Sequence, residues 1–362
     1  MDRLPTEIFL HIISYLRPPL APYTAICSIF QHYIEPTTFA RINVMVEGED
    51  PLEEFNTVFA VKRRRSLVRE IQLTIQLPLR INYRGFTKVV CGLFESLQEW
   101  DQDARELKQT PSFGLSILEP SYLPSKFGSC YNYLHKHVGF QGCQALPSLA
   151  CVIWLKVENI NIFPCSMATI CKALPRMREF SLSTDNAPRW VRDLRGDLRE
   201  TIASTLLDTN FSRLKALKVV FRDRDPSYDR TLKNHLDANG KDRLSLAINH
   251  ILKLPNLKSL ELEGPFILSP TVFDTDDGCG FVSKSLEYLC INVSKVTPAR
   301  GCEYRHSLGA SGKWRLEFYE PRRRKDQIPT PWTWKPPEEF REVVEAAGHS
   351  ITLTRGGCIM PI

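Results

Sequence analysis

The sequence predicts an α/β protein in which a short helical module precedes a larger, repetitive domain. Three observations support this prediction: two amphipathic helical stretches near the N-terminus, one strand pattern that recurs six times, and helical periodicity between the recurrences. A chain of 362 residues, 43% of them hydrophobic and 24% charged, is long enough for one small module and one large domain. We place the helical module at residues 1–45 and the repetitive domain at residues 60–362.

The first sixteen residues predict a short apolar helix with a defined start. Pro5 suits the first helical position, because its missing N–H would have no partner there, and Glu7 places a carboxylate at the positive end of the helix. Pro18 and Pro19 end this helix, and a second amphipathic segment follows over residues 25–33. One wide apolar stripe runs along the first helix through Ile8, Phe9, Ile12, Ile13 and Leu16. Helices this short bury little surface, so we expect them to need a partner surface.

Residues 2–42 resemble the F-box, the helical module through which substrate receptors dock onto the adaptor of SCF-type ubiquitin ligases. The resemblance rests on the Leu4-Pro5-x-Glu7-Ile8 opening, on residues 12–16 (IISYL), on Leu20, and on Ile26-Cys27-x-x-Phe30. The link between the helices is proline-rich without the usual acidic residue, and no tryptophan lies near Phe39. The resemblance implies binding to the adaptor, and through it to a cullin, by Leu4, Pro5, Ile8, Ile12, Leu16 and Leu20. The alternative is an ordinary helical hairpin that packs on its own domain.

Six segments of the larger domain fit the pattern apolar-x-x-apolar-x-apolar. In each, the last two apolar residues lie two positions apart, as a strand with one buried face requires, and the first lies on the turn leading in. The segments are Val68/Ile71/Leu73, Leu149/Val152/Trp154, Met177/Phe180/Leu182, Leu214/Leu217/Val219, Leu257/Leu260/Leu262 and Leu286/Leu289/Ile291. Their starts are separated by 81, 28, 37, 43 and 29 residues, so we expect the first interval to contain a further unit.

Helical periodicity fills the intervals at residues 89–97, 167–174, 201–207 and 244–252. Alternation of strand and helix predicts units that bury their faces only by stacking on one another. This pattern resembles leucine-rich repeats, and the whole chain resembles fungal F-box proteins with degenerate repeats. The prediction is therefore an F-box-like module followed by an irregular leucine-rich-repeat-like α/β solenoid, with a nonrepetitive α/β domain as the alternative. Residues 312–362, with strands expected at 314–320 and 351–354 and a helix at 338–347, are predicted to cap the stack.

No motif for catalysis or metal binding emerges. Cys130, His135, His137 and Cys143 lack the spacing of a zinc site, and residues 274–278 lack the glycine and glutamate of a calcium loop. No nucleophile elbow or phosphate-binding loop is present. We therefore expect neither enzymatic activity nor a metal or other cofactor. An enzyme whose site is assembled from residues distant in sequence remains an alternative.

Hydropathy and charge predict an intracellular protein, either cytoplasmic or nuclear or both. No apolar run reaches the roughly 20 residues that span a bilayer, and Asp2, Arg3 and Glu7 break up any signal-peptide pattern. In that compartment the eleven cysteines would be reduced thiols. The net charge of +6 is concentrated at residues 62–65 and 322–325. We interpret both runs as solvated surface, since no aromatic residues interleave them, and expect neither nucleic acid nor a membrane as partner.

These features predict a noncatalytic receptor that recruits an unidentified protein substrate for ubiquitination. Residues between the two buried positions of each strand share an outward face, and their mixed charge suits a protein partner. We predict substrate contacts at Lys215, Lys218, Lys258 and Glu261. A segment around Trp332 and Trp334 is the alternative recognition site. A protein-interaction scaffold unrelated to ubiquitin is the alternative function.

Overall fold

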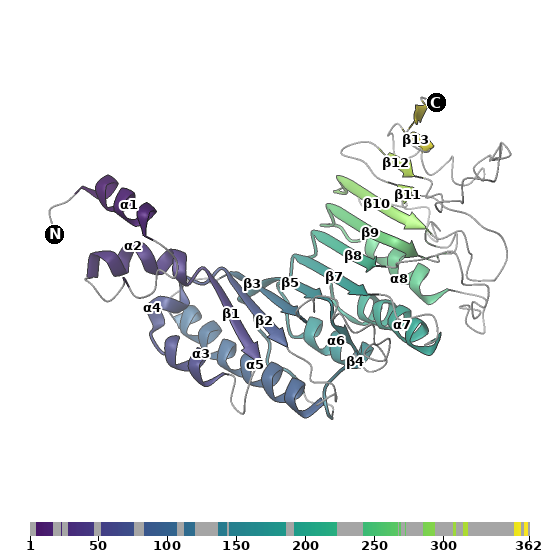
Figure 1. The fold of residues 1–362 in the computed structure, drawn as a ribbon. Helices are drawn as coiled ribbons and strands as arrows, with labels where there is room; N and C mark the ends of the chain where they lie inside the picture. Colours follow the sequence, from purple (N-terminus) through teal and green to yellow (C-terminus); the bar gives the residue numbers. More distant parts are fainter. Residues whose placement is uncertain are drawn as a thin grey trace, which may run out of the picture.

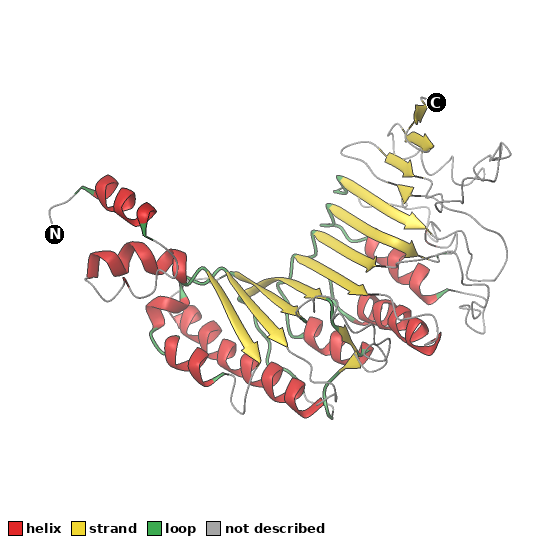
Figure 2. Cartoon of the chain, in the orientation of Figure 1, coloured by secondary structure: helices red, strands yellow, loops and turns green. Residues whose placement is uncertain are grey.

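The chain forms an elongated, curved α/β structure in which the strands follow one another along one large sheet (Figure 1). The helices that connect the strands lie along one face of this sheet (Figure 2). Within the described residues, no helix is both long enough and apolar enough to cross a membrane. The computed structural model describes residues 5–16, 23, 28–46, 52–75, 83–106, 112–119, 137–142, 145–185, 192–222, 242–266, 268, 272, 285–293, 307–308, 314–317, 351–355 and 358–360.

Eight parallel strands of the described chain form the sheet in the order in which the sequence reaches them. They are β1 (Arg41–Val46), β2 (Glu70–Ile75), β3 (Phe113–Leu118), β5 (Val152–Glu158), β7 (Glu179–Asp185), β8 (Ala216–Arg222), β9 (Ser259–Phe266) and β10 (Tyr288–Val293). Beyond β10 the strand direction changes, and four short strands continue the same sheet. They are β11 (Ser307–Leu308, antiparallel to β10), β12 (Trp314–Glu317, antiparallel to β11), β13 (Ile351–Arg355, parallel to β12) and β14 (Cys358–Met360, antiparallel to β13).

Most of the helices connect successive strands, and β4 (His137–Val138) and β6 (Asn161–Ile162) form a separate parallel pair. The helices are α1 (Thr6–Tyr15), α2 (Ser28–Thr38), α3 (Glu53–Val58), α4 (Lys62–Arg65), α5 (Tyr83–Glu106), α6 (Pro164–Lys172), α7 (Arg192–Asp208) and α8 (Arg243–Leu252). Asp242 caps α8 by accepting a hydrogen bond from the Ser245 N–H, 3.1 Å away, and also pairs with Arg199 of α7 at 2.6 Å. This buried carboxylate therefore ties two neighbouring units together.

Two rows of buried side chains run across the sheet in register and form its core. The first row is Ile71, Leu115, Leu155, Phe180, Leu217, Leu260 and Leu289, and the second is Leu73, Ile117, Val157, Leu182, Val219 and Leu262. Apolar side chains of α5 to α8, such as Leu93, Ile170, Leu206 and Ile251, join these rows in one continuous cluster. The α/β class predicted from the alternation of periods is thus confirmed.

The chain enters each parallel strand at the same side of the sheet, and we call this side, made of the N-terminal ends of the strands, the leading edge. The backbone geometry repeats from one strand entry to the next. The Arg178 carbonyl accepts hydrogen bonds from the N–H groups of Lys215 and Ala216, at 2.6 and 3.0 Å. The Lys215 carbonyl does the same for Lys258 and Ser259, at 2.7 and 2.9 Å. Residues that directly precede neighbouring strands therefore occupy equivalent positions.

The further unit expected in the first interval is β3, with its helix α5 before it. Two details differ from the prediction. β1 already belongs to the sheet, so the range 1–45 predicted for the helical module includes the start of a strand. The phase predicted for residues 149–154 is wrong, because Leu155 and Val157 occupy the buried rows and Trp154 lies on the opposite face. A β-bulge where β3 pairs with β5 shifts the register by one residue at this point.

The C-terminal predictions are met in part. The strand expected at 314–320 is present as β12, and the one expected at 351–354 is β13. Both extend the sheet beyond β10. The helix expected at 338–347 and the tryptophans at 332 and 334 lie outside the described residues.

We predict that Gly114→Ala destabilises the protein by about 1–3 kcal/mol, because a Cβ at this position would overlap the indole ring of Trp154 on the neighbouring strand. Chemical unfolding followed by circular dichroism measures the change. Replacing Trp154 with leucine in the Gly114→Ala background should recover most of the loss. If Gly114→Ala is as stable as the parent, the stacking of Trp154 over β3 is wrong.

Candidate functional site

The two N-terminal helices form a small core of their own, separate from that of the sheet. Phe30 and Ile34 of α2 are buried at its centre. Ile12, Ile13 and Leu16 of α1 pack against them. A hydrogen bond of 3.0 Å between the hydroxyls of Thr6 and Tyr33 also joins α1 to α2. Such a small core leaves much of α1 uncovered.

The uncovered side of α1 carries large apolar side chains. Ile8 is 45% exposed, Leu10 52% and Tyr15 73%. Ile8, His11 and Tyr15 follow one another at i, i+3 and i+7, so they share one side of the helix, and we call them the α1 strip. The His11 and Tyr15 rings meet edge to face with centroids 4.9 Å apart. An exposed apolar strip of this kind is typical of a surface that another protein covers.

The predicted adaptor residues fall into three groups. Pro5 and Ile8 are exposed, as a docking surface requires. Ile12 and Leu16 are half-buried against α2 and hold α1 in place. Leu4 and Leu20 lie outside the described residues. The sequence reasoning missed Tyr15, although its spacing of seven from Ile8 on the same helix could have indicated it.

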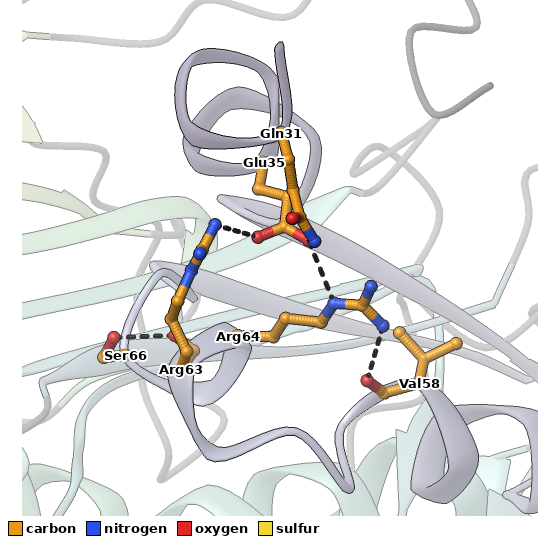
Figure 3. Close-up of polar contacts among 6 residues, drawn as sticks. All are labelled: Gln31, Glu35, Val58, Arg63, Arg64 and Ser66. Atoms are coloured by element: carbon orange, nitrogen blue, oxygen red, sulfur yellow. Dashed lines mark hydrogen bonds and ion pairs between the residues drawn. The ribbon is translucent and has the colours of Figure 1, made fainter. Parts of the chain in front are cut away.

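The helical pair is attached to the sheet domain through one buried carboxylate, shown in Figure 3. Glu35 of α2 is only 1% exposed, and its Oε2 lies 2.6 Å from Nη2 of Arg63. Its Oε1 accepts hydrogen bonds from Nε of Arg64 at 3.2 Å and from Nε2 of Gln31 at 2.9 Å. Arg64 also donates to the Val58 carbonyl at 3.2 Å. We call these residues the Glu35 clamp.

The other two cations of α4 point to α5. Lys62 pairs with Asp103 at 2.6 Å, and Arg65 pairs with the same carboxylate. Arg65 also donates to the Phe59 carbonyl at 2.7 Å and lies over the Trp100 ring. The interpretation of residues 62–65 as solvated surface holds only in part. Lys62 and Arg63 are exposed, but Arg64 and Arg65 are partly buried, and each of the four side chains pairs with an acid of α2 or α5. The second basic run, at 322–325, lies outside the described residues.

The clamp keeps Glu35 charged. Burial alone would raise the pKa of this carboxyl, but hydrogen bonds from Gln31 and Arg64 and the charges of Arg63 and Arg64 outweigh burial. The result is a pKa below the ordinary value of 4.5. Folding therefore gains stability from the carboxylate above that value and loses it as the pH falls through the lowered pKa.

The strand residues that alternate with the buried rows form a polar face. Its central row is Asn43, Gln72, Ser116, Lys156, Ser181, Lys218, Glu261 and Cys290, each opposite the next on neighbouring strands. Lys218 Nζ lies 2.9 Å from Glu261 and 3.0 Å from Glu263. Burial lowers the pKa of Lys218, but the two glutamates outweigh it and the pKa is raised. Lys218 is thus already paired with acids of its own chain.

The pKa of Glu261 is raised as well, first by burial and then by the adjoining Glu263 carboxylate, against the opposing effect of Lys218. The other two predicted substrate residues, Lys215 and Lys258, are exposed and lie at the leading edge. Lys258 pairs with Glu287 at 2.5 Å. The structure therefore divides the four predicted substrate residues into a neutralised pair on the polar face and two cations on the leading edge.

Little in the described part of the chain suggests bond-making chemistry. No group of three or more His, Cys, Asp or Glu side chains gathers there as metal ligands. Of the four residues dismissed as a zinc site from their spacing, Cys130, His135 and Cys143 lie outside it, as does the acidic turn at 274–278, and His137 belongs to β4. Burial raises the pKa of the Cys151 and Cys171 thiols, which disfavours the reactive thiolate. A shallow pocket of about 400 Å³ beside α6 is lined mainly by apolar and hydroxyl side chains.

No protein-family model, curated protein or solved structure matches this chain. The α1 strip, the Glu35 clamp and the charged surfaces of the sheet therefore carry the functional inference.

We predict that Glu35→Gln loosens the attachment of α1 and α2 by about 1–3 kcal/mol at neutral pH, because it leaves Arg63 and Arg64 without their carboxylate. Amide hydrogen exchange should become faster in α2 and stay unchanged in β7 to β9. The difference from the parent should shrink as the pH falls below 4.5 and through the lowered pKa of Glu35, because protonation then removes the same charge from the parent.

The matched control is Glu54→Gln on α3, an exposed glutamate. It should leave exchange in α2 unchanged. Equal acceleration in both variants would contradict the clamp.

Proposed function

We propose that this chain is a noncatalytic substrate receptor of an SCF-type ubiquitin ligase. In this proposal α1 and α2 are an F-box-like module that docks onto the adaptor, and through it onto a cullin. The sheet domain is an irregular leucine-rich-repeat-like solenoid that holds a protein substrate. The observation that carries the proposal is an α1–α2 pair with its own small core, an exposed α1 strip and a fixed attachment through Glu35.

The geometry of attachment supports a docking role. A helix pair that served only to cover the first strand would turn its apolar residues toward the sheet. Instead Ile8 and Tyr15 are exposed, while polar and charged contacts of Glu35 fix the orientation of α2. A fixed orientation lowers the entropic cost of binding a partner.

The sheet supports the second half of the proposal. Each parallel strand lies next to its predecessor in the sequence, and the helices between strands cover one face. This arrangement is typical of stacked repeats, in which each unit contacts mainly its neighbours and the strand face stays available for recognition. The mixed charges of the polar face suit a protein partner.

A protein-interaction scaffold unrelated to ubiquitin is the second candidate. The packing of Ile12 and Leu16 against α2 favours it, because these two side chains then stabilise the hairpin and leave a narrower surface for an adaptor. Binding to a purified adaptor separates the two functions.

We predict that Ile8→Glu combined with Tyr15→Glu weakens binding of the purified full chain to the purified SCF adaptor at least tenfold, because both side chains lie on the α1 strip. Isothermal titration calorimetry measures the affinity. Because both residues are exposed, the unfolding free energy should change by no more than about 0.5 kcal/mol per site.

Leu10→Glu is the matched control, since the exposure of Leu10 lies between those of Ile8 and Tyr15 but Leu10 lies on the opposite flank of α1. It should bind the adaptor as the parent does. A parent chain that does not bind the adaptor rules out the receptor function in favour of the scaffold, and a double variant that binds undiminished rules out the α1 strip as the docking surface.

A further inference from the structure

Three cations stand side by side where the chain enters β7, β8 and β9. Arg178, Lys215 and Lys258 directly precede these strands, and all three are exposed. The repeated carbonyl geometry of the leading edge puts them at equivalent positions, with Lys215 N–H bonded to Arg178 O at 2.6 Å and Lys258 N–H to Lys215 O at 2.7 Å. Neighbouring strands lie about 4.8 Å apart, so these residues form a ladder with one positive charge per strand. We call them the basic ladder.

More cations lie on the turns beside the ladder, between each helix and its strand. Arg176, Arg213 and Lys253 lie on these turns, and Lys172 is the last residue of α6. In the described part of the chain, none of these four, nor Arg178 or Lys215, makes an ion pair. Within these residues Lys258 is the one that pairs, with the exposed Glu287, which occupies the equivalent position before β10.

A comparison with the polar face shows that this excess of positive charge is specific to the leading edge. Lys218 lies three residues after Lys215, yet it is held between Glu261 and Glu263. Lys218 is therefore held between acids of its own chain, whereas within the described residues Arg178 and Lys215 make no ion pair and Lys258 has only the exposed Glu287. Like charges at neighbouring strand positions repel, and a bound anion relieves the repulsion.

We propose that the basic ladder binds an acidic segment of the protein substrate, an inference that deepens the receptor function proposed above and rests on it. An extended peptide laid along the leading edge meets one cation at each strand. Its acidic side chains recur about every 7 Å on one side, close enough to the ladder spacing for long Lys and Arg side chains to reach them.

Charge around the ladder favours a peptide over a nucleic acid. Glu179 follows Arg178 directly and is exposed, and Glu261 and Glu263 lie further along the polar face. A continuous polyanion that crossed from the ladder to this face would meet these carboxylates. A peptide can be acidic over the ladder and basic beyond it. Aromatic side chains nearby, such as Phe180 and Phe211, are buried and unable to stack on bases.

The test uses the purified full chain and a short fluorescein-labelled peptide of alternating glutamate and glycine. Fluorescence anisotropy should show binding that weakens as salt is raised. Replacing Arg178, Lys215 and Lys258 with glutamine should raise the Kd about tenfold, equivalent to about 1.4 kcal/mol. The control variant replaces Arg41, Arg69 and Arg84 with glutamine. It loses the same charge from other exposed positions and should keep the parent Kd.

Three results would overturn the inference: no binding of the peptide, equal weakening in both triple variants, or tighter binding of a single-stranded oligonucleotide that the ladder variant abolishes. Adaptor binding of the same variants separates this inference from the receptor function. Both triple variants should bind the adaptor as the parent does. Ladder-dependent peptide binding by a chain that does not bind the adaptor refutes the receptor function and leaves the acidic-segment site standing. Adaptor binding without ladder-dependent peptide binding refutes the site alone.

Discussion

The two buried rows that cross the sheet in register are the constraint on which the rest of the structure depends. A strand such as β8 buries Leu217 and Val219 only because β7 and β9 place Phe180 and Leu260 beside them and a helix covers the row. A slip of one residue would turn every apolar side chain to the wrong face, so the register is strongly specified. The same register fixes the positions of the strand residues that alternate with the buried ones. It thereby aligns the residues of the polar face and of the leading edge along the whole sheet. The charged surfaces are therefore consequences of how the core is packed.

The N-terminal helices are held by a different kind of interaction. Their own core is too small to orient them against the sheet. The contacts that do so are mainly charged, and the Phe39 ring just after α2 adds packing against Phe59 and Arg64. Because Arg63 is 53% exposed and Arg64 27%, the Glu35 clamp costs less to desolvate than a fully buried ion triad would. Its three directed hydrogen bonds specify orientation more than they add stability. An orientation fixed in this way keeps the α1 strip uncovered, which apolar packing against the sheet would not do.

Much of the sheet could be predicted because the hydrophobic residues of strands and helices recur with different periods. The errors of the prediction have identifiable physical causes. The lead-in position of β3 is Ser112, so the strand lacks the recurring pattern, whereas β1 fits it but falls within the range that resembles an F-box. Near residue 152 the recurring pattern fits twice, as Leu149/Val152/Trp154 and as Val152/Leu155/Val157. The bulge opposite Gly114 selects the second and turns Trp154 to the other face of the sheet. The sequence of α1 shows one apolar stripe but not which part of it α2 covers. The exposed residues available for docking could therefore not be distinguished from those that pack on α2. Pairing of the basic run at 62–65 depends on acids far away in sequence, which no local pattern reveals.

Lys215 and Lys218 show why residue type alone did not locate the recognition surface that we propose. Both are lysines of the same strand unit, but the register places Lys218 opposite Glu261 and Lys215 opposite Lys258. The first is neutralised within the chain, while the second adds to a row of like charge, so only the second is available to an outside anion. That row lies on β7 to β9, with β1, β2, β3 and β5 between it and the N-terminal helices. Sites this far apart are expected to bind independently. In the proposed receptor, the sheet between the two sites would hold a bound acidic segment at a fixed place relative to the partner that covers the α1 strip, and that fixed geometry is what a receptor requires of its scaffold.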